Sequence, residues 1–186
     1  MVQAAHSDEY KHDKVRSLIN KIGTAFMVTH SSGGQMHGRP MAVAEVKDGV
    51  ESLWFATQRN SGKTEELASD DHVFLGFVNA TGSDWVTVNG RGRIVDDRAK
   101  NRELWSPIWK NWFSGPEDPN LVLIEVTPES AEYWDNGSQA IAMLKFAVAA
   151  VTGKKMNEGD HGHVDFNRGG TSQTGGSVVS STQTDA

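Results

Sequence analysis

The chain has 186 residues, a formal net charge of −6 and no cysteine. This length suits one domain with appendages. The lack of cysteine excludes disulfides, thiol catalysis and thiolate metal sites, and it agrees with a reducing cytoplasm. The negative charge, without a basic stripe, argues against nucleic acid as a partner. No signal peptide or membrane-spanning run is apparent, so we expect a cytoplasmic protein without a membrane partner.

The first third of the chain predicts one helix and three strands. Residues 8–22 carry apolar side chains at helical spacing, which predicts an amphipathic helix that ends at Gly23. Strand-like runs follow at 24–29, 35–46 and 51–57, joined by short glycine-containing turns. These runs predict an antiparallel meander.

The second part of the domain mixes strands with helices. The expected elements are a helix over 61–69, strands over 72–79 and 84–95, an aromatic helix that Asp97 caps and Pro107 interrupts, and a strand over 121–126 that residues 131–134 extend. Gly90 and Gly92 permit a bulge within the strand over 84–95. About six short strands with helices between them predict a mostly β, α+β fold built on a small antiparallel barrel.

Composition divides the chain into three parts. We expect residues 1–7 to form a flexible N-terminus, residues 8–152 to form the domain with a C-terminal helix over 138–152, and residues 153–186 to form a polar, largely disordered tail. His161 and His163 offer a metal pair, but the flanking glycines favour a mobile segment.

The sequence around Lys63 is unusual for a helix start. Ser61 is a candidate N-cap, so Lys63 falls in the first turn, where free N–H groups already carry partial positive charge. A bound phosphate resolves this conflict. The alternative is an ordinary capped surface helix whose lysine points into water.

Arg39 lies on the strand that precedes the one leading to Lys63. Hairpin pairing brings it near the end of the strand over 51–57, where an arginine fork, a lysine, a serine and free amides suit a phosphate monoester. The alternative is a surface ion pair. Glu65 and Glu66, with Asp70 and Asp71, are most simply a solvated face.

Several short motifs follow one another along the chain. They are Gly38-Arg39-Pro40-Met41, Leu53-Trp54-Phe55-Ala56-Thr57, Ser61-Gly62-Lys63, Trp85-Val86-Thr87-Val88-Asn89-Gly90, Trp112-Phe113, Asp118-Pro119 and Ala131-Glu132-Tyr133-Trp134-Asp135, with Ala149 to Lys155 near the C-terminal end. In this order they resemble the general stress protein 26 branch of the pyridoxamine 5′-phosphate oxidase-like, FMN-binding split-barrel proteins. The resemblance covers about residues 8–165.

This resemblance implies a six-stranded antiparallel split β-barrel of Greek-key type with flanking helices. It also implies a homodimer with two FMN molecules between the subunits. By analogy, Arg39, Ser61 and Lys63 hold the FMN phosphate. The residues that would line the rest of the cofactor are Trp54, Phe55, Ala56, Thr57, Pro40 and Met41, with Trp85, Trp109 and Trp112 from the second subunit.

One departure from the family limits the expected activity. The pyridoxamine phosphate oxidases proper carry an Arg-x-His element that grips the substrate phosphate, and this chain has no counterpart. The expectation is therefore an FMN-binding stress-type flavoprotein, a candidate oxidoreductase of an unidentified small molecule. The alternatives are a non-catalytic flavin-binding or sensing module, and a split barrel that uses F420 or haem. No catalytic residue and no metal is assigned.

Overall fold

The computed structural model describes residues 7–79, 84–135 and 160–166. Its elements are α1 (Asp8–Ile22), β1 (Thr24–His30), β2 (Met36–Ala42), β3 (Glu45–Val46), η1 (Asp48–Val50), β4 (Leu53–Gln58), α2 (Gly62–Ser69), β5 (His72–Val78), β6 (Trp85–Val95), α3 (Arg98–Leu104), η2 (Pro107–Asn111), β7 (Leu121–Asp135) and β8 (Asp160–Asp165). The predicted helix over 138–152 lies outside these residues. No helix within them has the length and apolarity needed to cross a membrane.

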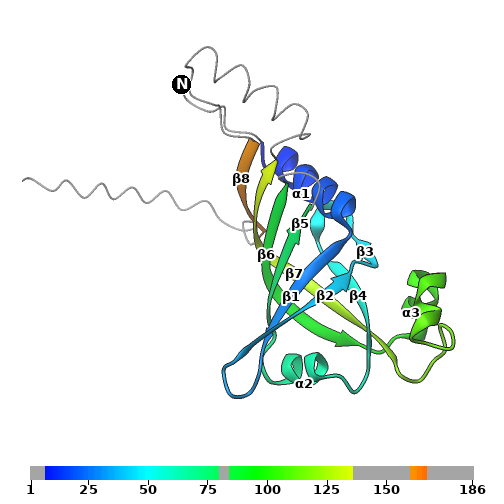
Figure 1. Cartoon of the computed structure of the whole chain (residues 1–186). Helices are drawn as coiled ribbons and strands as arrows, with labels where there is room; N and C mark the ends of the chain where they lie inside the picture. Colours follow the sequence, from blue (N-terminus) through cyan, green and yellow to red (C-terminus); the bar gives the residue numbers. More distant parts are fainter. Residues whose placement is uncertain (1–6, 80–83, 136–159, 167–186) are drawn as a thin grey trace, which may run out of the picture.

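All strands belong to one antiparallel sheet that curls into a barrel (Figure 1). The strand order is β2-β1-β5-β6-β7-β4-β3, and β8 pairs with β7. β2 pairs with β1, while β3, a few residues later, pairs with β4, so one bent segment joins the two edges of the sheet. Counting that segment as one strand gives a six-stranded barrel in which β5 returns beside β1, as in a Greek key. The predicted antiparallel split barrel is confirmed.

Helices lie at both ends of the barrel (Figure 1). α1 begins at Ser7, whose Oγ accepts a hydrogen bond from the Tyr10 N–H (3.2 Å), and ends at Gly23, whose φ of 72° suits glycine. Its apolar face enters the core through Val15, Leu18 and Ile19. α2 crosses the opposite end between β4 and β5 and buries Leu67 in the same core.

The long pair β6–β7 contains the predicted bulge. The register shifts between Asn89 and Gly90, opposite Pro128, which has no N–H to donate. A Cβ on Gly90 would lie 2.3 Å from the Thr127 carbonyl oxygen, so the backbones approach too closely for a side chain. β7 continues past Pro128 to Asp135, which confirms the predicted extension of this strand.

The later part of the chain contains a divided aromatic helix and an additional strand, β8. Pro107 divides the aromatic helix into α3 and η2, as predicted, and Asp97 caps α3 by accepting from the N–H groups of Ala99 (2.8 Å) and Lys100 (3.2 Å). The expectation of a disordered, mobile segment is wrong for residues 160–166, because β8 pairs along β7 and Gly162 packs against the Tyr133 ring.

Candidate functional site

A cavity of about 400 Å³ lies between the outer side of β2 and β4, the start of α2 and the aromatic segment after α3. Its volume falls within the usual range for small-molecule sites. The lining residues are Pro40, Met41, Ala42, Ala56, Thr57, Gln58, Lys63, Ile108, Trp109, Trp112 and Phe113. Seven of the predicted site residues therefore line one cavity of a single chain: Pro40, Met41, Ala56, Thr57, Lys63, Trp109 and Trp112. Trp109 and Trp112 were expected from a second subunit, but here they belong to the same chain as the others.

The α2 N-terminus contributes the polar end of this site. Ser61 is the N-cap, and its backbone N–H donates to Thr64 Oγ1 (3.1 Å). The Ser61 hydroxyl lies 3.3 Å from Lys63 Nζ and 3.5 Å from Thr57 Oγ1. The amides of Gly62 and Lys63 stand in the first turn, where a helix offers no internal acceptor. Hydroxyl, ammonium and free amides thus meet beside the cavity.

Lys63 lacks a compensating negative charge in direct contact. Within the described part of the chain, no carboxylate lies within 4.0 Å of its Nζ, and its one hydrogen bond goes to Ser61. Burial lowers the pKa of Lys63, the charge of Arg39 lowers it further, and Glu66 acts in the opposite direction. A bound anion would favour the charged lysine, so these residues fit a phosphate group.

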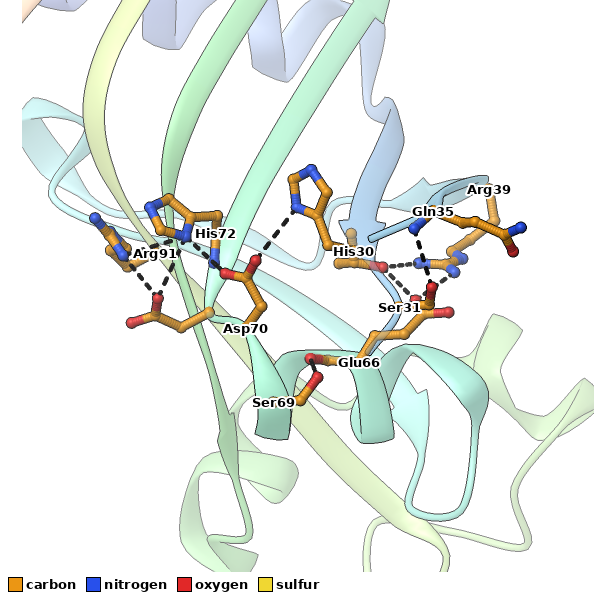
Figure 2. Close-up of polar contacts among 11 residues, drawn as sticks. His30, Ser31, Gln35, Arg39, Glu66, Ser69, Asp70, His72 and Arg91 are labelled. Atoms are coloured by element: carbon orange, nitrogen blue, oxygen red, sulfur yellow. Dashed lines mark hydrogen bonds and ion pairs between the residues drawn. The ribbon is translucent and has the colours of Figure 1, made fainter. Parts of the chain in front are cut away.

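Arg39, which is expected at the phosphate, is not among the residues that line the cavity. Its Nη1 donates to Thr29 Oγ1 (2.5 Å) and its Nη2 to Glu66 Oε2 (2.8 Å), as Figure 2 shows for Arg39 and Glu66. The interaction with Lys63 nevertheless places it near the α2 start. A guanidinium has five N–H donors, so three remain for another acceptor.

Glu66 was missed as a site residue. The interpretation of Glu65 and Glu66 as a solvated face is wrong for Glu66, whose side chain is 10% exposed. Glu66 is one of the three buried residues of α2, together with Thr64 and Leu67. The signal available in the sequence was weak: a partly buried arginine on the neighbouring strand requires a counter-ion.

Three predicted aromatic residues do not line the cavity. Phe55 is fully buried in the main core. Trp54 packs in a second apolar cluster with Trp109, its Nε1–H donates to Ser52 Oγ (2.9 Å), and a lysine ammonium lies 5.0 Å from its ring centre. Trp85 lies at the start of β6 and is 48% exposed. Trp85 therefore takes no part in the cavity of its own chain.

Trp109 and Trp112 have different surroundings. Trp109 is buried and meets Trp105 edge to face, with ring centres 5.8 Å apart. Trp112 is 62% exposed, although it lines the cavity. Trp109 therefore supports the wall, and Trp112 offers a free indole at the cavity mouth.

The outer face of the sheet carries several exposed apolar side chains. Exposed side chains on β1, β5, β6 and the end of β7 lie beside one another, because Trp85 pairs opposite Val78 and Trp134, and Phe26 opposite Gly76. The exposed apolar residues of this face are Phe26, Phe74, Val78, Trp85 and Trp134.

A second polar cluster lies at the C-terminal end of α2 (Figure 2). Asp70 approaches His72 Nδ1 (2.6 Å) and His30 Nδ1 (3.7 Å), and Arg91 Nη1 donates to Asp71 Oδ1 (2.8 Å). Asp70, Asp71 and His72 are close enough to share an ion. Arg91 already supplies positive charge there, so the cluster is compensated by its own residues.

Known proteins place this chain in a family. The model of the pyridoxamine 5′-phosphate oxidase-like family matches residues 10–157. Protein bli-3 of Neurospora crassa is 32% identical over 157 residues, covering 78% of this chain and 75% of that protein. The general stress protein 26 structure from Bacillus anthracis is 26% identical, with a TM-score of 0.61, covering 67% and 93% of the two chains.

A third likeness concerns the fold. The structure of a general stress FMN/FAD binding protein from Xanthomonas citri has a TM-score of 0.59 at 23% identity, covering 72% of this chain and 93% of that chain. These matches agree with the barrel, the motifs and the order of the elements described above. The chain belongs to the pyridoxamine 5′-phosphate oxidase-like family, and its relatives include general stress protein 26.

Proposed function

We propose that the protein binds FMN, with the 5′-phosphate at the α2 N-terminus and the remainder of the cofactor in the cavity beside it. The observation that carries this proposal is Lys63, a partly buried cation without a carboxylate partner among the described residues, on the wall of a largely apolar cavity. The name of the Xanthomonas citri relative makes a flavin the first ligand to test.

Each part of the site has a role in this proposal. Lys63, Ser61 and the first amides of α2 hold the phosphate, and Arg39 supplies its remaining N–H donors. Met41 and Trp112 form apolar and aromatic surfaces for a flat ring. When bound, FMN would supply electron or hydride transfer, while the protein binds it, orients it and limits its contact with water.

The assembly we propose is a homodimer that encloses the cofactor. Phe26, Trp85 and Trp134 are exposed apolar side chains on one face of the sheet, and exposed apolar side chains that group together mark protein–protein interfaces. Trp112 remains 62% exposed within one chain, so a second subunit has room to complete the cavity. Analytical ultracentrifugation tests this assembly, and a monomer at micromolar concentration would contradict it.

Flavin titration tests the proposed cofactor. Purified protein should be yellow or should bind added FMN tightly, with quenching of flavin fluorescence. Lys63→Ala should weaken binding by roughly 1.5–3 kcal/mol, the value of a hydrogen bond to a charged group. Lys47→Ala is the matched control, because Lys47 pairs with Glu45 and lies outside the cavity. Equal effects of the two replacements would mean that the phosphate site is misplaced.

A second candidate function is flavin binding or sensing without turnover. Among the described residues that line the cavity, Lys63 is the one ionisable side chain, and none of these residues is a carboxylate or histidine that could transfer a proton. Anaerobic mixing with NADH or NADPH separates the two functions. Rapid bleaching of bound flavin with steady turnover would favour an oxidoreductase, and slow reduction would favour the binding module.

A further inference from the structure

Glu66 connects the helix that carries Lys63 with the strands that carry Thr29 and Arg39. Its Oε2 accepts hydrogen bonds from Thr29 Oγ1 and from Arg39 Nη2 (2.8 Å), and its Oε1 lies 2.5 Å from His37 Nδ1. The carboxylate is 10% exposed and the Arg39 side chain 22% exposed. Both are therefore largely removed from water, where a charged pair depends on good geometry.

The contacts of Arg39 form a closed ring. The Thr29 hydroxyl accepts from Arg39 Nη1 (2.5 Å) and donates to Glu66, while Arg39 Nη2 donates to the same carboxylate oxygen. Two different nitrogens of the guanidinium are thus fixed by two different elements, β1 and α2. This arrangement sets both the position and the plane of the guanidinium, since two fixed nitrogens leave the fork little rotational freedom.

The same carboxylate moderates repulsion between two cations. Arg39 disfavours the charged form of Lys63, and Glu66 favours it. Burial raises the pKa of Glu66, but its hydrogen bonds and the charge of Arg39 outweigh burial and lower that pKa to about 2. Glu66 is therefore ionised at neutral pH and lets two cations stand near one another before any ligand arrives.

We propose that Glu66 is a positioning residue that holds Arg39 in the orientation needed to receive the flavin phosphate. The inference rests on the proposed function and adds to it the basis of preference for FMN over riboflavin. A carboxylate near a phosphate also repels it, so charge alone would make removal of Glu66 favourable to binding. We expect the opposite effect, namely weaker FMN binding when Glu66 is removed, because a released Arg39 side chain loses its fixed orientation.

Two replacements separate orientation from charge. Glu66→Ala removes the charge and the acceptor, and it should weaken FMN binding by on the order of tenfold, because a freed arginine side chain recovers rotamer entropy. Glu66→Gln removes the charge but keeps an oxygen for Arg39 and Thr29, and it should retain most of the FMN affinity. Riboflavin affinity should change little in both variants, since riboflavin has no phosphate.

The experiment measures dissociation constants for FMN and riboflavin by fluorescence quenching. The proteins are the wild type, Glu66→Ala, Glu66→Gln, Arg39→Ala and the double variant Glu66→Ala/Arg39→Ala. Glu65→Ala is the matched control, because Glu65 is exposed on the same helix. If Glu66 acts through Arg39, adding Glu66→Ala to Arg39→Ala should cause no further loss of FMN affinity. Melting temperatures report whether each variant folds.

The outcomes distinguish this inference from the proposed function. Wild-type protein that binds no FMN would overturn the proposed function and, with it, the role of Glu66. Wild-type protein that binds FMN while Glu66→Ala leaves the affinity unchanged or tighter would overturn only the positioning role. Equal losses for FMN and riboflavin, or additive losses in the double variant, would assign Glu66 a structural role and also overturn the inference. If Glu66→Ala fails to fold, the FMN affinities of Glu66→Gln and Arg39→Ala still test the inference. Equal losses of FMN affinity in these two variants would contradict it, because Glu66→Gln is expected to keep most of the affinity.

Discussion

Between pH 5 and pH 3, the Glu66→Gln protein should lose about 2 kcal/mol less of its free energy of unfolding than the wild type loses. Burial opposes ionisation of Glu66, but hydrogen bonds with Thr29, His37 and Arg39, together with the charge of Arg39, hold its pKa at about 2, below the ordinary value of 4.5. A carboxylate whose pKa is lower in the folded state stabilises the fold above the unfolded pKa. That contribution is lost as the pH falls from 4.5 towards 2.

The difference between the two pKa values is worth roughly 3 kcal/mol at neutral pH, of which about 2 kcal/mol disappears between pH 5 and pH 3. Glutamine does not ionise, so the Glu66→Gln protein lacks this component. The other carboxylates are common to both proteins, and their contributions cancel when the two pH profiles are subtracted.

Urea denaturation at pH 5, 4 and 3 gives the free energy of unfolding for the wild type, Glu66→Gln and the exposed control Glu65→Gln. The wild type and the control should lose stability in parallel, and Glu66→Gln should lose about 2 kcal/mol less. Parallel losses in all three proteins would refute the reasoning, because Glu66 would then be no more strongly held than a surface carboxylate.

Further predictions concern glycine packing and the two tryptophan environments. Gly90→Ala places a Cβ 2.3 Å from the Thr127 carbonyl oxygen and should destabilise the protein by about 1–3 kcal/mol. Gly38→Ala should destabilise it less, because its Cβ meets only the exposed ring of Phe26, which can move aside. Equal urea midpoints for the two variants would contradict this difference. Trp54→Ala should cost about 3–5 kcal/mol of stability, because Trp54 is buried. Trp112→Ala should change the free energy of unfolding by less than about 0.5 kcal/mol, because Trp112 is exposed. It should nevertheless weaken FMN binding, as measured by titration. A large loss of stability would show that Trp112 supports the fold instead.

Local signals were sufficient for most of the barrel. Glycine-containing turns and runs of β-forming residues predicted the meander, and helical spacing up to Gly23 predicted α1. The closure of the barrel was less visible, because it depends on one bent segment that pairs with β1 and then with β4. β8 was missed because its sequence is short, polar and interrupted by Gly162, and its stability comes from pairing with β7 and packing on Tyr133.

Some features of the candidate site follow from local sequence signals, whereas the surroundings of several of its residues depend on packing. The position of Lys63 relative to Ser61 follows from the helix start alone. Trp54 and Phe55 were expected beside the cofactor, yet both side chains are buried. One face of β4 packs Phe55 into the main core, and the other face packs Trp54 into the second apolar cluster with Trp109. The burial of Glu66 depends on α2 packing against β1, which a helix pattern read alone does not reveal.

We propose that the α2 N-terminus, with Lys63 and Arg39, forms a site for the flavin phosphate. The most direct measurement is the ratio of riboflavin to FMN dissociation constants, for the wild type and for the Arg39→Ala/Lys63→Ala variant, at one fixed salt concentration. The account predicts much tighter binding of FMN by the wild type and loss of that preference in the variant. Equal affinities of the wild type for FMN and riboflavin, or an unchanged ratio in the variant, would contradict it.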